Sequence, residues 1–258
     1  MADAVQPAVI APIKPGTTTS FESFQQVDAG LLNVGYAEAG PAGGPAVLLL
    51  HGWPYDIYSY ADTTPALAAA GYRVIVPYVR GYGTTRFLSQ DTLRNGQQAA
   101  LAADVIALMD ALNIDRAILA GFDWGARSAD IVVALWPGRC QGLVSVSGYL
   151  IASQAAGAAP LPPSAEYAWW YLFYFATDRG RAGYEKYRRE GDANGAPHAD
   201  ASTYARKFSG TYEHRVIAGG IGHNLAQEAP QAFAQAVIDV DGYSPMKITG
   251  EAATPPHP

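Results

Sequence analysis

Residues 117–125, which read AILAGFDWG, say more about the architecture than any other part of the chain. A short apolar run that ends in glycine is typical of a strand buried on both faces of a parallel sheet. Gly121 and Gly125 flank Asp123, and a tight turn from strand to helix needs such small residues because its backbone folds back on itself. The turn would present Asp123 at the carboxyl edge of the sheet, beside a helix N-terminus that favours negative charge.

Apolar runs of the same kind recur along the chain and alternate with helical segments, which predicts a mostly parallel α/β sheet. The runs expected to form its strands are residues 46–50, 73–78, 117–120, 142–146 and 214–218. Helices are predicted at residues 64–70, at residues 97–112 and through Phe233 and Val237. A β-hairpin made of residues 21–27 and 31–37 is expected to precede the parallel part.

The composition fits one folded domain that carries an insertion. Of the 258 residues, 49% are hydrophobic and 16% are charged, which is close to ordinary globular usage. After residue 150 the sequence becomes rich in alanine, proline and aromatic residues and then in charges, as expected for an inserted segment. The expected parts are a flexible arm at residues 1–20, an α/β core at 21–150 and 202–243, a shortened cap with the acid loop at 151–201, and a flexible tail at 244–258.

Charge and cysteine content exclude several classes of protein. The formal net charge is −6 and no run of lysine or arginine could line a phosphate backbone, so nucleic acid is not an expected partner. Cys140 is the single cysteine, which excludes an intrachain disulfide and a cysteine metal cluster and fits a cytoplasmic location. No apolar run reaches the roughly 18 to 20 residues of a membrane-spanning helix, so no membrane partner is expected. A homodimer is left open.

The residue types around the turn predict nucleophilic chemistry. A carboxylate at Asp123 can displace a leaving group from an sp3 carbon, which forms an ester that water then hydrolyses at the carbonyl of the enzyme. His223 lies in a glycine-flanked loop after a late strand, and we expect it to be the general base. The backbone N–H groups of Trp53 and Trp124 are expected to form an oxyanion hole for the tetrahedral intermediate. His51 is expected to be structural.

Together these motifs resemble the α/β-hydrolase family, and within it the branch that contains epoxide hydrolases and haloalkane dehalogenases. The matching sequences are GFDWG at residues 121–125 and HGWP at 51–54, and RGYG at 80–83 looks especially like epoxide hydrolases. The resemblance implies an α/β-hydrolase fold in which a helical cap is inserted into the core. It also implies a reaction without a cofactor, in which water opens a small apolar epoxide to a diol.

The resemblance implies a further role for aromatic residues of the cap. Epoxide hydrolases of this branch use cap tyrosines to bind the epoxide oxygen and to protonate the departing alkoxide. In the sequence WYLFYF that begins at Trp170, Tyr171 is the expected proton donor and Tyr174 is the reserve. Dehalogenases bind halide with indole N–H groups instead, which Trp124 and either Trp169 or Trp170 could supply. Dehalogenation of a haloalkane or haloacid is therefore one alternative function.

The sequence departs from the family pattern before the expected triad acid. Family members place a hydrophobic strand there, whereas residues 184–190 read YEKYRRE and contain no aliphatic side chain. The segment from the cap to the acid loop is also shorter than the family pattern, so the second half of the cap and one strand of the sheet are expected to be missing. The shortened chain is expected to have reduced stability and reduced or lost activity.

Two residues of the same segment are candidates for the position of the triad acid. Asp192 is the nearest carboxylate and is the expected acid, although the usual Gly-x-x-Asp spacing points to position 194, which is Asn194. An asparagine can orient an imidazole by hydrogen bonding but cannot stabilise imidazolium by charge. A non-catalytic relative that binds a small apolar ligand is the second alternative, and the missing strand is the feature that favours it.

Overall fold

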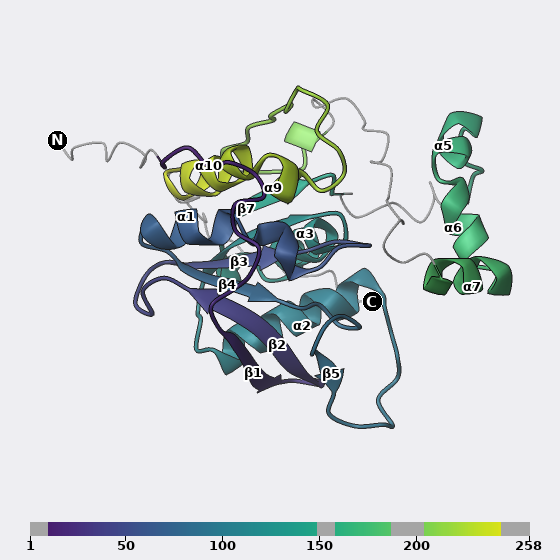
Figure 1. Ribbon diagram of the computed structural model, residues 1–258, viewed down its shortest axis with the longest axis horizontal. Helices are drawn as coiled ribbons and strands as arrows, with labels where there is room; N and C mark the ends of the chain where they lie inside the picture. Colours follow the sequence, from purple (N-terminus) through teal and green to yellow (C-terminus); the bar gives the residue numbers. More distant parts are fainter. Residues whose placement is uncertain (1–9, 149–157, 187–203, 244–258) are drawn as a thin grey trace, which may run out of the picture.

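The computed structural model describes residues 10–148, 158–186 and 204–243, which form an α/β core and a group of cap helices (Figure 1). The strands are β1 (Phe24–Ala29), β2 (Leu32–Ala39), β3 (Ala46–Leu50), β4 (Arg73–Pro77), β5 (Arg86–Phe87), β6 (Ala117–Phe122) and β7 (Cys140–Val146). The α-helices are α1 (Thr63–Ala69), α2 (Gln98–Ala111), α3 (Trp124–Leu135), α5 (Pro163–Ala168), α6 (Trp170–Phe175), α7 (Asp178–Lys186), α9 (Leu225–Glu228) and α10 (Pro230–Asp241). Two 3-10 helices are η1 (Ile57–Tyr60) and η2 (Pro137–Arg139).

The described strands form one sheet in the order β1-β2-β4-β3-β6-β7, and β5 pairs with β2. Strand β3 is parallel to β4 and β6, and β6 is parallel to β7. Strands β1 and β2 form an antiparallel hairpin, and β2 joins the parallel part by pairing antiparallel to β4. The mostly parallel α/β sheet predicted from the sequence is confirmed, and so is the hairpin at its edge.

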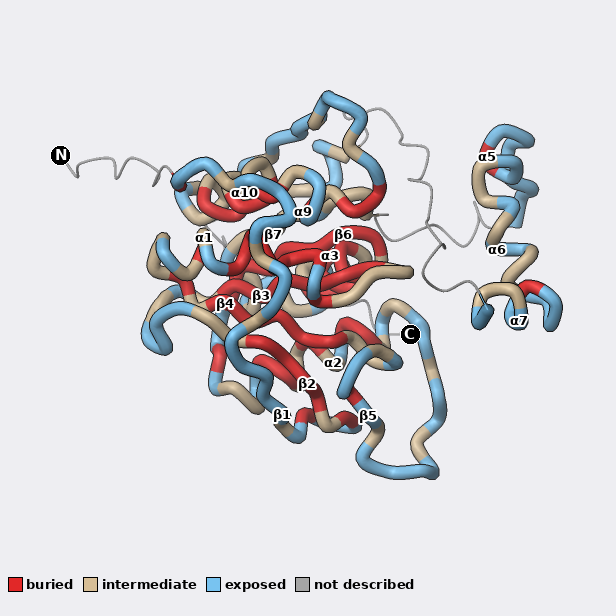
Figure 2. The backbone as a smooth tube through the Cα atoms, in the orientation of Figure 1, coloured by how far each residue is buried: buried red, intermediate tan, exposed pale blue. Residues whose placement is uncertain are grey.

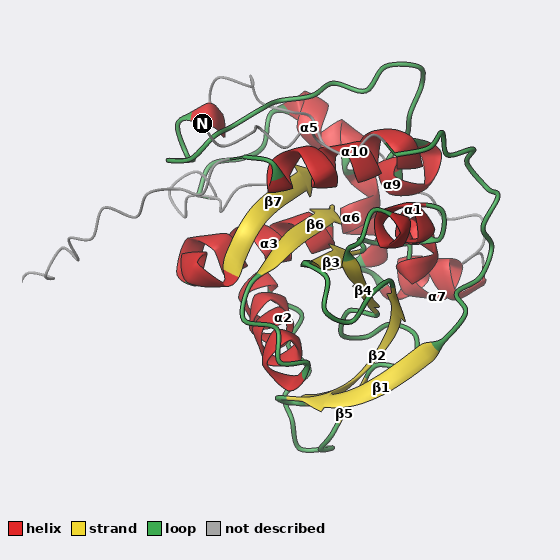
Figure 3. Ribbon diagram, turned by 90° about the vertical axis from the view of Figure 1, so that its left-hand side faces the viewer, coloured by secondary structure: helices red, strands yellow, loops and turns green. Residues whose placement is uncertain are grey.

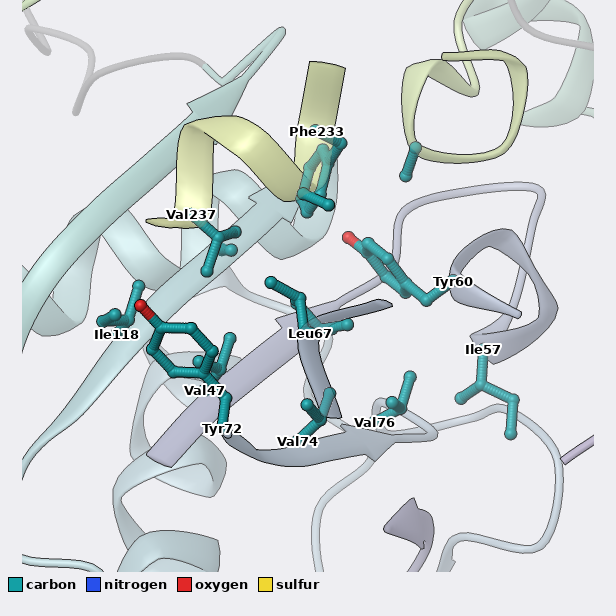
Figure 4. Packing of buried hydrophobic residues seen from close by; sticks show 14 of the residues in the cluster. Val47, Ile57, Tyr60, Leu67, Tyr72, Val74, Val76, Ile118, Phe233 and Val237 are labelled. Atoms are coloured by element: carbon teal, nitrogen blue, oxygen red, sulfur yellow. The ribbon is translucent and has the colours of Figure 1, made fainter. Parts of the chain in front are cut away.

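Helices cover both faces of this sheet, with α2 and α3 on one face and α1, α9 and α10 on the other (Figure 3). Successive side chains of β3 therefore enter different cores. Val47 and Leu49 pack in the cluster that contains Phe233 of α10 (Figure 4), whereas Leu48 and Leu50 pack in the cluster formed with α2 and α3. All four β3 side chains are fully buried, and each such burial contributes roughly 1.5–3 kcal/mol.

The N-terminal segment, in which the sequence predicts a flexible arm at residues 1–20, lies against the core from residue 10 onward. Ile10 is buried, and the backbone N–H of Ile13 donates to Gln231 Oε1 of α10 at 2.7 Å. The N–H groups of Gly16 and Thr18 donate to the Asp62 carboxylate at 2.5 and 2.6 Å. These bonds hold the pKa of Asp62 below its ordinary value even though burial alone would raise it.

The strand predicted at residues 214–218 is wrong, because these residues form no strand. Val216 is 80% exposed, and Arg215 forms ion pairs with Glu213 at 2.8 Å and with Asp239 at 2.7 Å instead. An extended segment becomes a strand only where a neighbour satisfies its backbone N–H and C=O groups. Strand β7 is the last strand on this side of the sheet in the described part of the chain, so the apolar run has no described strand beside it.

The cap helices α5, α6 and α7 are mostly exposed, in contrast to the buried strands of the core (Figure 2). They lie within the segment where the sequence predicted an inserted cap, whereas residues 187–203 lie outside the described part. None of the described helices is both long and apolar enough to cross a membrane.

Candidate active site

Asp123 occupies a sharp turn between β6 and α3. Its backbone angles are φ 49° and ψ −117°, in the left-handed half of the map that non-glycine residues rarely adopt. Its N–H donates to the carbonyl oxygen of Val146 at 3.1 Å, and its own carbonyl oxygen accepts from the N–H of Arg127 at 2.9 Å. Such strain at one residue is characteristic of functional turns that the surrounding structure enforces. The turn expected from the sequence is therefore present at this residue.

The two flanking glycines are required by close backbone contacts. A Cβ atom at Gly121 would lie 2.7 Å from the backbone carbon of Gly125. A Cβ atom at Gly125 would overlap the carbonyl oxygen of Leu50 at the end of β3. Because both contacts are with backbone atoms, no side-chain rotation can relieve them.

The substitution Gly125→Ala is expected to destabilise the fold by about 3 kcal/mol or more, because the turn must open to admit the methyl group. Chemical denaturation followed by circular dichroism would measure this loss. Gly138→Ala is the matched control, since a Cβ atom there meets nothing within 4 Å, and it should change the free energy of unfolding by no more than about 0.5 kcal/mol. Equal stability of the two variants would contradict the tight turn.

The two oxygens of the Asp123 carboxylate have different surroundings. Oδ1 accepts a hydrogen bond of 2.9 Å from the backbone N–H of Trp53. Oδ2 faces Nη2 of Arg127 at 3.7 Å and Nε2 of His223 at 3.9 Å. Both distances exceed those of direct hydrogen bonds. One oxygen is therefore fixed by the main chain, while the other faces a cation and an imidazole.

The backbone N–H of Trp53 reaches Asp123 because β3 and β6, the strands that precede these residues, are neighbours in the sheet. Strands β3 and β6 run parallel, with Leu50 paired to Gly121, so their carboxyl ends meet at one edge. Gly52 permits the close approach, since a Cβ atom there would lie 2.6 Å from the Cβ of Asp123. Trp124 is the first residue of α3, and N–H groups of a first helical turn have no partner within the helix.

His51 lies in the same loop but is held as a structural residue. It is fully buried, and burial lowers its pKa to about 4, so the imidazole is neutral near pH 7. Its Nε2 accepts from the N–H of Val79 at 3.2 Å, which leaves Nδ1 to donate to the carbonyl oxygen of Gly52 at 3.2 Å. The ring thereby connects the loop after β3 to the loop after β4.

His223 faces Oδ2 of Asp123, whereas the Trp53 N–H is bonded to Oδ1. Its ring packs edge-on against Phe122 at 6.0 Å and lies tilted against Tyr55 at 6.2 Å. The side chain is 5% exposed, and its Nδ1 has no hydrogen-bond partner among the described residues. Buried polar atoms are nearly always hydrogen-bonded, and Nδ1 is the atom through which a triad acid would orient this ring. The expected acid, Asp192, and its rival Asn194 lie outside the described residues.

Cap residues approach the site through the side chain of Trp53. Tyr171 stacks on this indole with ring centres 6.0 Å apart and planes 12° apart. Phe175 and Tyr184 contact the same indole at 5.6 and 5.7 Å. The pKa of Tyr171 is raised by burial and by the negative charge of Asp123, so its hydroxyl keeps its proton near neutral pH.

The other aromatic residues considered as site residues contact other side chains or are exposed. Tyr174 packs against Trp170 at 5.9 Å and against Phe175 at 5.5 Å. Trp170, a candidate for binding halide, is 57% exposed. The ring of Trp124 lies under the guanidinium of Arg127 at 5.0 Å. Sequence reasoning missed Arg127, although its position four residues after Asp123 on a predicted helix was the available signal.

Comparison with known proteins places most of the core in one family. Residues 45–211 match the family model described as the alpha/beta hydrolase fold. Epoxide hydrolase B of Mycobacterium tuberculosis is 41% identical over 105 residues, which cover 40% of this chain and 29% of that protein. Epoxide hydrolase 2 of Siraitia grosvenorii is 36% identical over 108 residues, which cover 42% of this chain and 34% of that protein. The matched region thus spans about a third of the length of these relatives.

A solved structure matches over a larger part of the chain. It is a Klebsiella pneumoniae protein provisionally assigned as an epoxide hydrolase, 47% identical, with a TM-score of 0.80. The match covers 86% of this chain and 98% of that one, so the two chains are of similar length. An epoxide hydrolase of Vigna radiata is 25% identical with a TM-score of 0.54, over 63% of this chain and 52% of that one.

Proposed function

Because this chain belongs to the α/β-hydrolase fold family, we propose that it opens epoxides with water through an ester formed on Asp123. The observation that carries the proposal is the unequal setting of the two carboxylate oxygens, with Oδ1 on the Trp53 N–H and Oδ2 facing His223. An oxygen already held by a backbone donor is suited to become the carbonyl oxygen of an ester. The other oxygen is suited to attack carbon. The names of the relatives support the epoxide as substrate.

The first step forms the ester. Oδ2 of Asp123 attacks an epoxide carbon, the carbon–oxygen bond breaks, and its electron pair goes to the epoxide oxygen. The hydroxyl of Tyr171 gives its proton to this oxygen. A tyrosine hydroxyl is protonated near neutral pH, and burial and Asp123 raise the pKa of Tyr171 further, so the proton is in place before the attack.

The second step hydrolyses the ester. Nε2 of His223 takes a proton from water as the hydroxide adds to the acyl carbon of Asp123, and the negative charge on Oδ1 is stabilised by the N–H groups of Trp53 and Trp124. The intermediate collapses by breaking the bond between the acyl carbon and the alkyl oxygen, which receives the proton from His223. The proton released by the regenerated carboxyl group restores Tyr171 through solvent, so one epoxide and one water give one diol.

The orientation of His223 requires a partner at Nδ1. We assign this role to Asp192, with Asn194 as the alternative, because the buried Nδ1 has no partner among the described residues. A carboxylate there would select the tautomer in which Nε2 can accept a proton and would stabilise the imidazolium that follows.

Product analysis separates epoxide opening from its alternatives. The chain should be incubated with styrene oxide and, in parallel, with 1-bromobutane and bromoacetate, and diol and bromide should be quantified. Diol formation without bromide release is expected, and the 57% exposure of Trp170 already disfavours that indole as part of a halide site. Bromide release without diol would favour the dehalogenase, and neither product would favour the non-catalytic relative.

The substitution Tyr171→Phe is expected to slow ester formation by about 100- to 10,000-fold, since it removes the proton donor but keeps the stacked ring. Rapid mixing of excess enzyme with epoxide, followed by mass spectrometry, would measure this rate. Tyr167→Phe is the matched control, because Tyr167 belongs to the same cap and is 83% exposed. If Tyr171→Phe behaves like this control, Tyr171 only packs the cap, and Tyr174→Phe becomes the variant to measure.

Three further expectations from the sequence remain proposals: a cytoplasmic location, a homodimer, and reduced stability or activity of a chain with a shortened cap.

A further inference from the structure

One residue links the cap to the nucleophile. The backbone N–H of Trp53 donates to Oδ1 of Asp123 at 2.9 Å, while the indole of the same residue packs against three rings of the cap. The four rings form the indole cluster, which consists of Trp53, Tyr171, Phe175 and Tyr184. The cluster therefore connects α6 and α7 to the loop that holds one oxygen of the carboxylate.

Helices α6 and α7 contact the core through a loop residue rather than through its helices or strands. They pack on each other, and no described strand or helix of the core packs extensively against either. On α6, Tyr171 and Phe175 are one turn apart and both contact the indole, whereas Leu172 and Phe173 are 54% and 61% exposed. The described contacts of α6 with the core thus lie on one face of the helix.

The corner between α6 and α7 fixes where Tyr184 lies. Oγ1 of Thr177 donates to the carbonyl oxygen of Tyr174 at 2.7 Å and accepts from the N–H of Gly180 at 3.0 Å. A Cβ atom at Gly180 would overlap the carbonyl oxygen of Tyr174, so the first turn of α7 lies directly against the end of α6. Tyr184 follows one turn later on α7 and is thereby brought back toward the rings of α6.

Tyr184 reaches Tyr171 through two shared neighbours. Its ring meets Phe175 edge-on at 5.3 Å and lies tilted against Trp53 at 5.7 Å. Tyr171 contacts the same two rings, Phe175 at 6.3 Å and Trp53 at 6.0 Å. Edge-on and offset ring pairs attract each other beyond the area that they bury. Removing the Tyr184 ring would therefore loosen both neighbours that hold Tyr171.

The hydroxyl of Tyr171 must be placed accurately to give its proton to the epoxide oxygen. Proton transfer requires a separation of about 2.6–3.2 Å, and a misplacement of about 1 Å can cost about 100-fold in rate. We propose that Tyr184 is a positioning residue whose ring, as part of the indole cluster, holds Tyr171 within reach of the epoxide oxygen. This inference rests on the proposed function.

The two chemical steps should depend on Tyr184 to different degrees. Ester formation needs the proton of Tyr171, whereas ester hydrolysis needs His223 and backbone donors of the core. The loop after β3 is held from the core side by His51, whose Nδ1 donates to the carbonyl oxygen of Gly52 at 3.2 Å. Loss of the Tyr184 ring should therefore slow the first step and spare the second, whereas a general loosening of the fold would slow both.

Three variants test this difference with excess enzyme, styrene oxide and mass spectrometry. Tyr184→Ala is expected to slow ester formation about 10- to 100-fold while the ester decays within about 2-fold of the wild-type rate. Tyr184→Phe keeps the ring without the hydroxyl and should restore the wild-type rate of ester formation. Phe173→Ala, which truncates an exposed ring of α6, is the matched control and should leave both steps unchanged.

Hydrogen exchange of the free protein separates failure of this inference from failure of the proposed function, because it needs no substrate. Amides of α6 should exchange at least about 10-fold faster in Tyr184→Ala than in the wild-type chain, but not in Tyr184→Phe or Phe173→Ala. Unchanged exchange in Tyr184→Ala, equal slowing of both chemical steps, or a Tyr184→Phe variant as slow as Tyr184→Ala would overturn the inference. A wild-type chain that forms no ester would overturn the proposed function instead.

Discussion

Replacing Asp123 with alanine is expected to lower the rate of diol formation at least about 10,000-fold, because loss of a covalent nucleophile leaves only the surrounding donors to assist the reaction. The turn can tolerate the change, since alanine is smaller than aspartate and removes only the carboxylate that Trp53, Arg127 and His223 face. Steady-state assays with styrene oxide over hours would detect the residual rate.

Two controls make this result specific to Asp123. Asp91→Ala alters an exposed aspartate in a loop and should keep full activity. Circular dichroism of Asp123→Ala should match that of the wild-type chain, so that a loss of activity is not a loss of fold. A residual rate within about 10-fold of wild type would mean that water or another residue attacks the epoxide.

Replacing His223 with glutamine is expected to stop the reaction at the ester rather than before it. Nε2 of His223 lies 3.9 Å from Oδ2, beyond hydrogen-bond distance, so the imidazole does not assist the attack directly, and its role is to take a proton from the water that attacks the acyl carbon. Loss of the base should therefore leave ester formation within about 10-fold of wild type while hydrolysis slows about 1,000-fold or more. Intact-protein mass spectrometry should show one substrate mass added to each chain.

The matched control for this variant is His214→Gln, which alters an exposed histidine on the loop before the site. It should turn over normally without accumulating an adduct. If His223→Gln instead forms no adduct with excess epoxide, the histidine acts in the first step or maintains the site. Normal turnover by His223→Gln would remove His223 from the mechanism altogether.

Local sequence predicted those parts of the fold in which the neighbours along the chain impose the geometry. The turn at Asp123 follows from two glycines whose absent side chains allow contacts with Leu50 and with the backbone of α3. The sequence also predicted that the Trp53 N–H lies near Asp123, because adjacent parallel strands end at one edge of a sheet. Both inferences needed only the order of strands and the size of the residues between them.

The errors arose where a distant part of the chain decides the outcome. Residues 214–218 have the apolar pattern of a buried strand but not the neighbouring strand that would satisfy their backbone. The contacts of residues 13–18 with the core were not predicted either, because their partners Asp62 and Gln231 are far from them in sequence. Arg127 was missed for a different reason, since an arginine on a helix is usually at the surface and only its distance to Asp123 marks it out.

The similar length of the Klebsiella pneumoniae structure bears on the expectation that the cap is shortened. That chain aligns over 98% of its residues with a TM-score of 0.80, so a protein of comparable size with this core has been crystallised. A relative of about this length that shares this core is therefore folded. Thermal unfolding of this chain tests the predicted decrease in stability. A cooperative transition would count against the prediction, and a non-cooperative one would support it.

Isotope labelling of Asp123 tests the ester mechanism most directly. A single turnover with enzyme in excess over styrene oxide should be run in water enriched in oxygen-18, and tryptic digestion should follow in ordinary water. Cleavage after Arg116 and Arg127 gives the peptide 117–127, in which Asp123 is the single acidic side chain. The ester route predicts that this peptide gains 2 mass units from one heavy oxygen while the diol is unlabelled. An unlabelled peptide with the heavy oxygen in the diol would show direct attack by water and contradict the mechanism.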